Sequence, residues 1–362
     1  MINRLSDFIY RFSIVSLIFI KNWYVFFLAT FLFFSYLVFI NRRSILVSKY
    51  YLFMVGALLI LLINLYDLYP IKEIFRNTIF IFTFIVFFTA SEIQFKLNAE
   101  GVKFIILTIV LYFLIIISLN YDTLLLERRY FTFEQDSLGS NSLALYPLSG
   151  MLLILKFKKE IERKVIVYFS IIAIIGAFFI DSMWFYLACA IYIYILLEDT
   201  LLKDRYRIRL HFLLIIAFIF FGYDFFKLFL EDVASNSIIS RWDYTSQGIS
   251  HFLNYSFGNN YLNTYGLDQS VFDTRTHDDN SNYHNTYVYL LNRFGYQVVF
   301  FFIALVYMLF KQYQDNYNLF IFLFFVMFVV FNIESVFNEK IVFITIAIIA
   351  SLKTGKKSKN AN

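Results

Sequence analysis

The chain has 362 residues, of which 60% are hydrophobic and only 16% are charged. This composition excludes an ordinary soluble domain, in which about a quarter of the residues are charged. The formal net charge is +5, and because the lysines and arginines lie between apolar runs, we expect no nucleic-acid partner. The single cysteine, Cys189, falls inside an apolar run, which excludes an intramolecular disulfide and a cysteine-based metal site.

Apolar runs recur along the chain, each of about 17–20 residues and long enough to cross roughly 30 Å of hydrocarbon as a helix. We therefore predict an all-α polytopic membrane protein. The clear spans, in chain order, are Trp23–Ile40, Tyr50–Tyr66, Phe75–Ala90, Val102–Leu119, Leu138–Leu155, Val165–Ile180, Met183–Leu197, His211–Leu230, Phe294–Phe310 and Leu319–Phe331. Ile341–Leu352 is a shorter span, and Phe8–Ile20 is either a further span or a helix lying in the membrane interface.

Basic residues gather on one side of the predicted membrane if the spans simply alternate. The pair Arg42–Arg43, the segments Lys156–Lys164 and Lys203–Arg209, and the tail Lys353–Lys359 all fall on that side. Loops rich in lysine and arginine stay in the cytoplasm, so this side is predicted to be cytoplasmic. An even number of spans places both termini there, which favours about twelve transmembrane helices, with eleven as the alternative.

These predictions divide the chain into three parts. Residues 1–230 hold the first nine spans, residues 231–293 form a large polar segment that faces outwards, and residues 294–362 hold the last three spans and the basic tail. A second outward loop is predicted at Tyr121–Ser137. The span centres are nearly free of ionisable groups, whereas ion-coupled transporters usually need carboxylates or broken helices at the midplane. This pattern argues against a transporter.

The polar segment contains three of the four histidines, His251, His277 and His284. His284 shares a predicted helical face with Tyr287, Val288 and Leu291.

Ser281 or Asn282 is the expected N-cap of this helix, which would place His284 and Asn285 in its first turn. The positive end of a helix disfavours an imidazolium, so a neutral His284 could take a proton from an incoming hydroxyl. The alternative is a histidine that only caps the helix or is satisfied in the interface.

Two further features of the outward segments have a chemical interpretation. His277-Asp278-Asp279-Asn280 with His284 offers ligand types for a divalent ion, but the spacing matches no standard site. A solvated turn is the preferred interpretation, and no metal or cofactor is predicted. The adjacent Arg128 and Arg129 lie outside against the positive-inside trend, which indicates an anion or phospholipid head groups as their partner.

Arg241-Trp242 begins an amphipathic stretch in which Ile249, Phe252 and Leu253 are apolar among polar neighbours. This pattern predicts a helix in the outer interface. Its arginine would face a lipid phosphate or a substrate phosphate.

The order of motifs in the polar segment carries a resemblance. Arg241-Trp242 opens the segment, Phe257-Gly258-Asn259-Asn260 follows, and His284-Asn285 with Arg293-Phe294-Gly295 closes it. In this order and topology the chain resembles the O-antigen ligase and polymerase superfamily, which includes the Wzy-type repeat-unit polymerases. Upstream, Arg128–Leu143 is similar to that family's Arg…Phe…Asn segment entering a span, with Asn141 in the position of the asparagine.

The resemblance implies a GT-C-like fold and a metal-independent, inverting glycosyltransferase with a polyprenyl-pyrophosphate-linked glycan as donor. It implies that His284 is the general base on the acceptor hydroxyl. Arg241 would meet the charge of the leaving pyrophosphate, assisted by Arg128 or Arg129, because guanidinium groups bind phosphate oxygens bidentately.

Three other residues are predicted to serve substrate binding. Asn285 would orient a backbone or sugar group, Asn141 follows from the upstream likeness, and Gly258 would supply a turn. One departure from the family lies at Ile180–Trp184, where the ligases commonly have a Ser-Arg pair. The arginine is absent here, so Arg128, Arg129 or Lys227 would have to replace it.

The first interpretation is a polymerase that joins undecaprenyl-pyrophosphate-linked repeat units into O-antigen or capsular polysaccharide. The resemblance then places the chain in the bacterial inner membrane with the polar segment in the periplasm, and it implies membrane lipids and a chain-length regulator protein as partners. The alternatives are a ligase that transfers the glycan to lipid A core, which the missing Ser-Arg pair disfavours, and a polysaccharide transporter or flippase.

Overall fold

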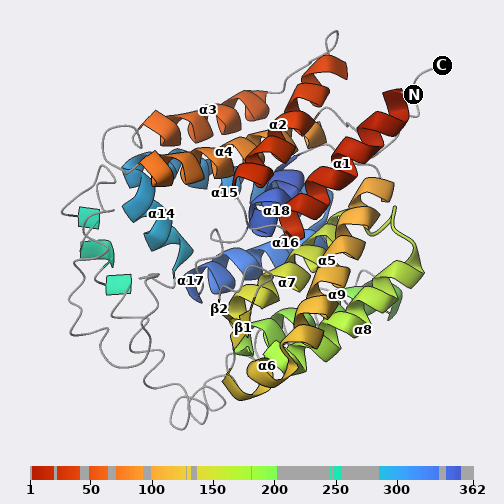
Figure 1. Cartoon of the computed structure of the whole chain (residues 1–362). Coiled ribbons are helices and arrows are strands. Elements are labelled where there is room, and N and C mark those ends of the chain that lie inside the picture. The colour runs from red at the N-terminus through yellow and green to blue at the C-terminus, as the bar shows by residue number, and fades with distance from the viewer. Residues whose placement is uncertain are drawn as a thin grey trace.

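The computed structural model describes residues 2–19, 23–40, 49–63, 71–92, 99–127, 129–131, 137–180, 182–201, 245–246, 248–250, 252–253, 285–333 and 340–351. These residues are almost entirely helical and form a bundle with one small sheet (Figure 1). The elements are α1 (Ile2–Phe19), α2 (Trp23–Ile40), α3 (Lys49–Ile63), α4 (Ile71–Glu92), α5 (Ala99–Leu119), α6 (Tyr121–Glu127), β1 (Arg129–Phe131), β2 (Ser137–Gly139), α7 (Ser140–Phe157), α8 (Arg163–Ile180), α9 (Met183–Leu201), α14 (Thr286–Phe294), η2 (Gly295–Gln297), α15 (Val298–Asp315), α16 (Tyr317–Phe325), η3 (Val326–Val330), α17 (Phe331–Ile333) and α18 (Lys340–Ala350).

The helices follow the predicted spans where the structure describes them. The second helix, α2, has the predicted bounds, and α8 and α9 differ from the prediction by a few residues at one end. Among the described residues, three helices are long and apolar enough to cross a membrane, Glu100–Leu119, Arg163–Ile180 and Gly295–Asp315, and several further apolar helices are shorter. The predicted span His211–Leu230 lies outside the described residues.

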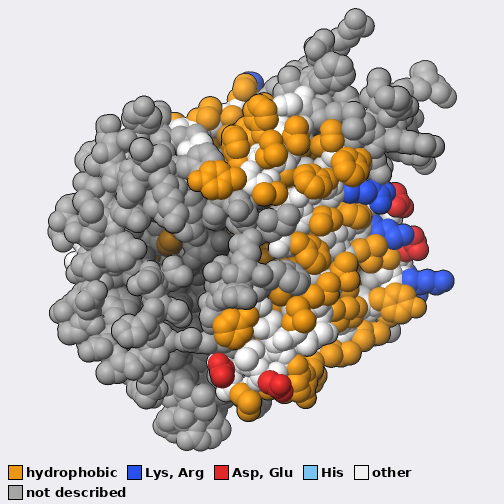
Figure 2. All heavy atoms as spheres, in the orientation of Figure 1, with side chains coloured by type: hydrophobic (Ala, Val, Ile, Leu, Met, Phe, Trp, Pro, Cys, Tyr) orange, Lys and Arg blue, Asp and Glu red, His pale blue; other side chains and the backbone are white. Residues whose placement is uncertain are grey.

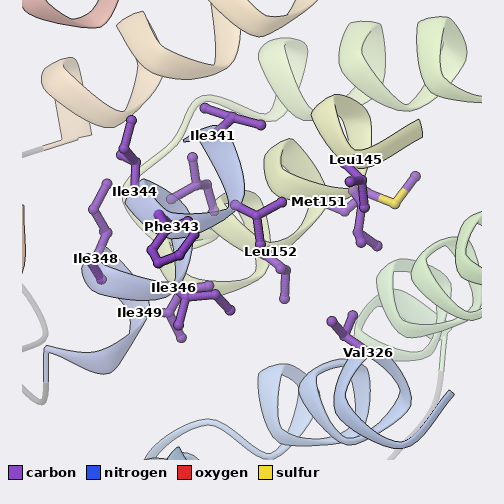
Figure 3. Close-up of a cluster of buried hydrophobic side chains, with 14 of the residues drawn as sticks. Leu145, Met151, Leu152, Val326, Ile341, Phe343, Ile344, Ile346, Ile348 and Ile349 are labelled. Carbon is purple, nitrogen blue, oxygen red and sulfur yellow. The ribbon is translucent and has the colours of Figure 1, made fainter. Parts of the chain in front are cut away.

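Helix α18, predicted as the short last apolar run Ile341–Leu352 before the tail, occupies the centre of the bundle (Figure 1). Every residue from Ile341 to Ala350 is buried, and α18 packs against α4 and α7. Figure 3 shows its side chains Ile344 and Ile346 in one cluster with Met151 and Leu152 of α7. An apolar helix surrounded by other helices has no polar face to present, which explains why its hydrophobicity is uniform.

Two glycines set how closely the neighbouring helices approach. The Phe169 ring of α8 lies directly against Gly150 of α7, and the Phe113 ring of α5 lies against Gly176 of α8. In each case a Cβ atom on the glycine would overlap the ring. Small residues at helix crossings permit close approach in membrane proteins, so these two contacts fix the packing of α5, α7 and α8.

One described face of the bundle is apolar where it is exposed. Figure 2 shows hydrophobic side chains across α1, α5 and α8, while the charged side chains of the described residues lie at the margins of this face, most of the basic ones at its right edge. The exposed hydrophobic side chains of these three helices include Phe8, Phe12, Val15, Leu107, Leu111, Leu114, Val167, Tyr168, Ile171, Ile175 and Phe178. Soluble monomers rarely expose apolar patches of this extent, so the face is suited to contact with lipid.

Buried polar bonds join three helices at the end of the bundle where α7 and α18 both finish. Lys156 is only 8% exposed, and its Nζ donates to Gln312 Oε1 of α15 at 3.4 Å and to the Ser351 carbonyl after α18 at 3.1 Å. Asn316 Nδ2 donates to the Leu155 carbonyl at 3.0 Å. The cation thus meets the negative end of α18. Lys156 is therefore part of the packed bundle, which corrects its prediction as the start of a basic loop.

The first helix, α1, packs within the bundle. Ser13 donates to the Ala29 carbonyl of α2 at 3.0 Å, and Tyr10 donates to the Gly101 carbonyl of α5 at 3.0 Å. Both side chains are buried in these contacts. The weak N-terminal apolar run is thus a single helix with tertiary partners on α2 and α5.

Candidate functional site

The predicted outward loop Tyr121–Ser137 contains structure that the sequence did not indicate. Helix α6 follows α5 directly, and β1 and β2 then pair as antiparallel strands. The strand pair includes Leu138, so α7 begins at Ser140, and the prediction that this span starts at Leu138 is wrong by two residues. Within the described residues, this hairpin is the one departure from an all-helical fold.

Asn120 attaches the hairpin to the end of α5. Its Oδ1 accepts from the Phe131 N–H at 2.7 Å, and its Nδ2 donates to the Phe131 carbonyl at 3.0 Å and to the Ile116 carbonyl at 2.9 Å. The side-chain amide therefore pairs with β1 as a neighbouring strand would. This arrangement uses both the donor and the acceptor capacity of a buried asparagine.

The hairpin register places Arg129 near Asn141, and both residues are predicted to bind substrate. Arg129 of β1 pairs with Gly139 of β2, two residues before Asn141 in the first turn of α7. The backbone of Arg129 thus lies beside the end of β2 that leads into α7. The contact of this region with an anion stays a prediction, and Arg128 lies outside the described residues.

The helix at the end of the polar segment, α14, begins later than predicted. It covers Thr286–Phe294, and its N-cap is Asn285. The prediction that Ser281 or Asn282 caps this helix, with His284 in the first turn, is therefore wrong. His284 precedes the cap in the chain and lies outside the described residues.

Asn285 satisfies the helix start and also joins it to a neighbouring element. Its Oδ1 accepts from the N–H groups of Tyr287 at 3.0 Å and Val288 at 3.1 Å, and its Nδ2 donates to Asn332 Oδ1 at 3.2 Å. Asn332 in turn donates to the Phe328 carbonyl at 2.9 Å. Because Asn285 is only 6% exposed, it acts chiefly as an internal cap and link.

Tyr287 anchors α14 on a π-helical turn, η3. Its hydroxyl donates to the Met327 carbonyl at 2.7 Å, and its ring lies edge-on to Phe302 at 5.3 Å and near Phe331 at 5.9 Å. Burial raises the pKa of Tyr287 to about 12, so the hydroxyl keeps its proton and remains a donor at neutral pH. Single π-helical turns inside α-helices are frequent at functional sites.

Asn292 joins α14 to the stretch near Gly248, earlier in the polar segment. Asn292 of α14 is 2% exposed, and its Nδ2 donates to the Gly248 carbonyl at 2.8 Å and to the Val288 carbonyl at 2.9 Å. Residues 248–250 and 252–253 are helical, and Ile249 and Leu253 are exposed. The described part of this stretch thus agrees with the predicted amphipathic helix after Arg241.

The chain turns sharply between α14 and α15 at Gly295. This residue has φ 70° and ψ −168°, a backbone conformation that is essentially restricted to glycine. The predicted span Phe294–Phe310 corresponds to η2 and α15, and α14 is a separate helix that ends where this span begins. Helix α14 packs on α17, and its Tyr287 reaches η3 through the bond to Met327.

A scan against protein-family models gave no match, and searches of curated proteins and of solved structures found no similar chain. The resemblance of the polar segment to the O-antigen ligase and polymerase superfamily therefore stays a prediction from its motifs.

The described site residues form two groups. Asn141 and Arg129 lie at the hairpin and the start of α7, and Asn285 lies at the start of α14. The predicted residues outside the described parts of the chain are Arg128, Arg241, Gly258 and His284, together with the cluster His277–Asn280. Within the described residues, no group of three or more histidine, cysteine or acidic side chains could hold a metal ion.

The sequence reasoning missed Asn292, Asn332 and Tyr287 as parts of this arrangement. Asn292 had a recognisable signal, because it lies seven residues after Asn285 and therefore on the same face of the helix. Two asparagines at this spacing in an otherwise apolar helix indicate bonds to neighbouring elements. For Asn332 there was no such signal, since its partner is distant in the sequence.

Proposed function

We propose that the chain is a membrane-embedded glycosyltransferase that joins polyprenyl-pyrophosphate-linked repeat units into O-antigen or capsular polysaccharide. The observation that carries this proposal is the organisation of the polar segment. Within this segment, Arg241 lies toward the beginning and His284-Asn285 toward the end, and Asn292 donates a bond to the Gly248 carbonyl. A base and a phosphate-binding cation at the two ends of one closed segment are the groups that a metal-independent transfer needs.

The proposed reaction assigns one role to each end of the segment. His284 removes the proton from the acceptor hydroxyl, whose oxygen then forms a bond to the anomeric carbon of the donor glycan. The bond from that carbon to the pyrophosphate oxygen breaks, and the pyrophosphate leaves with the electron pair. Arg241, with Arg128 or Arg129, stabilises the charge that develops on the leaving group.

The position of the helix cap supports the proposed state of the base. His284 immediately precedes Asn285 in the chain, and Asn285 caps α14. The N–H groups of the first turn and the helix dipole disfavour a positive charge beside a helix start. We therefore expect His284 to be neutral near pH 7 and able to accept a proton.

The apolar bundle supports a lipid-linked donor. Three described helices are long and apolar enough to cross a membrane, and one face exposes hydrophobic side chains broadly (Figure 2). A substrate attached to a polyprenyl chain would reach the site within the bilayer. By the charge distribution of the sequence, the site lies on the periplasmic side, opposite the basic tail.

A deletion strain distinguishes the proposed polymerase from the alternatives. Loss of a polymerase leaves lipid A core that carries a single repeat unit, whereas loss of a ligase leaves core with no repeat unit at all. Loss of a flippase leaves lipid-linked units facing the cytoplasm. Single-unit glycan on the core is the expected result, and either of the other patterns would overturn the assignment to a polymerase.

The metal-independent character of the reaction has its own test. Purified protein in lipid should polymerise lipid-linked repeat units equally well with and without a chelator of divalent cations. Loss of activity on chelation, restored by a divalent cation, would instead assign a role to the cluster His277–Asn280 and contradict the arginine-based chemistry.

A further inference from the structure

We propose that the turn between α7 and α8 binds an anionic phospholipid, with the headgroup on its basic side chains and the acyl chains along α5 and α8. This basic turn, residues 158–164, lies at the end of the bundle that the charge distribution predicts to be cytoplasmic. The proposed transfer reaction does not use this surface, so the inference stands or falls independently of that reaction.

The basic turn carries an excess of positive charge at its surface. It holds four basic and two acidic residues, a net charge of 4 − 2 = +2. Lys159, Arg163 and Lys164 are exposed, and Lys158 is half-buried. Arg163 and Lys164 form the start of α8, where the helix dipole disfavours cations. The local helix therefore gives no reason for their charge, whereas an external anion does.

One of the two carboxylates is already neutralised from outside the turn. Lys103 of α5 donates from its Nζ to Glu162 Oε1 at 2.6 Å. This pair also joins α5 to the beginning of α8. Within the turn itself, the four cations then face only Glu160 as a counter-charge, which increases the positive potential that an approaching headgroup meets.

The backbone of the turn is held in place before any ligand binds. The N–H groups of Glu160 and Ile161 donate to the Phe157 carbonyl at 2.8 Å and 3.1 Å. The Ile161 side chain is only 7% exposed and packs into the core of the bundle. A preorganised site loses less conformational freedom on binding than a flexible one, so the basic side chains can bind a headgroup at a low entropic cost.

Two exposed apolar stripes begin at the basic side chains. On α8, Tyr168, Ile171 and Ile175 lie about one, two and three turns after Lys164, and all three are exposed. A tyrosine one turn from a basic residue is typical of a membrane interface. The matching exposed stripe on α5 begins after Lys103 and consists of Leu107, Leu111 and Leu114.

The combination of charge and apolar surface selects the ligand. Figure 2 shows most basic side chains at the right edge of the hydrophobic face, so cations border the surface that acyl chains would cover. Basic residues beside a membrane-spanning helix attract anionic lipids. A soluble anion would use the cations and leave the stripes uncovered, and a zwitterionic phospholipid would cover the stripes without matching the charge.

The test measures lipid binding to the full-length protein, delipidated in a neutral detergent, by native mass spectrometry. The ligands are dioleoyl phosphatidylglycerol and dioleoyl phosphatidylcholine. The test variant is Arg163→Gln/Lys164→Gln. The matched control is Lys49→Gln/Lys311→Gln, which removes the same charge from α3 and α15.

We expect the wild type to bind phosphatidylglycerol more tightly than phosphatidylcholine. Each basic residue near an anionic lipid surface strengthens binding roughly fivefold, so Arg163→Gln/Lys164→Gln should weaken phosphatidylglycerol binding by about 25-fold and leave phosphatidylcholine binding unchanged. The control variant should retain the wild-type affinity. Glu160→Gln keeps every cation and removes the counter-charge, so it should bind phosphatidylglycerol more tightly, and it tests the proposal even if the double variant does not fold.

Three results would overturn the proposal. Equal affinity of the wild type for the two lipids would show that the charge has no role. An equal loss in the control variant would assign the effect to net charge and not to this turn. Glycerophosphoglycerol, the same headgroup without acyl chains, should bind far more weakly than the lipid, and comparable binding would make the turn a site for soluble anions.

Discussion

Replacing the cap residue Asn285 by alanine tests whether the start of α14 contributes to both stability and activity. The substitution removes the acceptor for two N–H groups, of Tyr287 and Val288, and the bond to Asn332. Loss of an asparagine N-cap typically costs about 1 kcal/mol. Val288 is buried, so its N–H has little access to water, and the cost should lie toward the upper part of a range of about 1–2 kcal/mol. Asn332 is exposed, and water can replace its lost bond.

The assay is thermal unfolding of the purified protein in lipid, combined with the length of glycan made in a deletion strain. Asn285→Ser keeps a cap acceptor and should recover most of the stability, whereas Asn316→Ala serves as a matched control. Asn316 caps α16 by accepting from the Leu319 N–H at 3.1 Å and also bonds to another helix. We expect both alanine variants to lose similar stability, and only Asn285→Ala to shorten the glycan.

Two results would refute this reasoning. If Asn285→Ser is destabilised as much as Asn285→Ala, the cap bonds do not carry the effect. If Asn316→Ala shortens the glycan as strongly as Asn285→Ala at equal protein levels, the effect on activity comes from general loss of stability and not from the start of α14.

Three further predictions concern the bundle and its surface. Gly176→Ala should destabilise the protein by about 1–3 kcal/mol, because the added Cβ overlaps the Phe113 ring. Gly56→Ala, where nothing lies within 4 Å of the added Cβ, should stabilise the protein by roughly 0.5–1 kcal/mol. Thermal unfolding should therefore show a lower melting temperature for the first variant and a higher one for the second. Gly295→Ala should cost about 1–3 kcal/mol, since alanine is strained at φ 70° and ψ −168°, and an unchanged melting temperature would contradict this. The hydrogen bond that Lys103 donates to Glu162 at 2.6 Å lowers the pKa of Glu162 below its usual 4.5. This exposed pair should therefore add a small stability above pH 4.5, and the contribution should vanish as the pH falls through the lowered pKa. Glu162→Gln should remove the part of the difference in melting temperature between neutral and acidic pH that this pair causes.

The helices were predictable because apolar runs and charged boundaries dominate this chain. Trp23–Ile40 and the run ending at Ile180 could be placed closely from hydrophobicity alone. The burial of α18 at the centre was not predictable, since an apolar run has the same composition whether it faces lipid or other helices. Likewise, the sequence places Lys156 at the start of a basic loop, because its bond to the Ser351 carbonyl after α18 depends on how the helices pack.

The start of α14 shows why the site was only partly predictable. The sequence pattern predicted Ser281 or Asn282 as the cap and placed Asn285 inside the helix, although all three residue types can accept the required bonds. The choice of Asn285 depends on tertiary contacts, because Tyr287 must reach the Met327 carbonyl and the cap must reach Asn332.

The hairpin had no sequence signal for a similar reason. Its strands are three residues each and carry no extended alternation of polar and apolar residues. Asn120 supplies the pairing partner that holds β1. Side-chain bonds between distant segments are therefore what hydrophobic patterning leaves undetermined in this chain.

The most direct test of the central claim is the glycan pattern of a deletion strain complemented with either the wild-type chain or His284→Ala. We predict long-chain polysaccharide with the wild type and only single repeat units on the core with His284→Ala, when both proteins are inserted in the membrane at equal levels. Long-chain product of normal length and amount from His284→Ala would contradict the assignment of the polar segment as the site of glycosyl transfer.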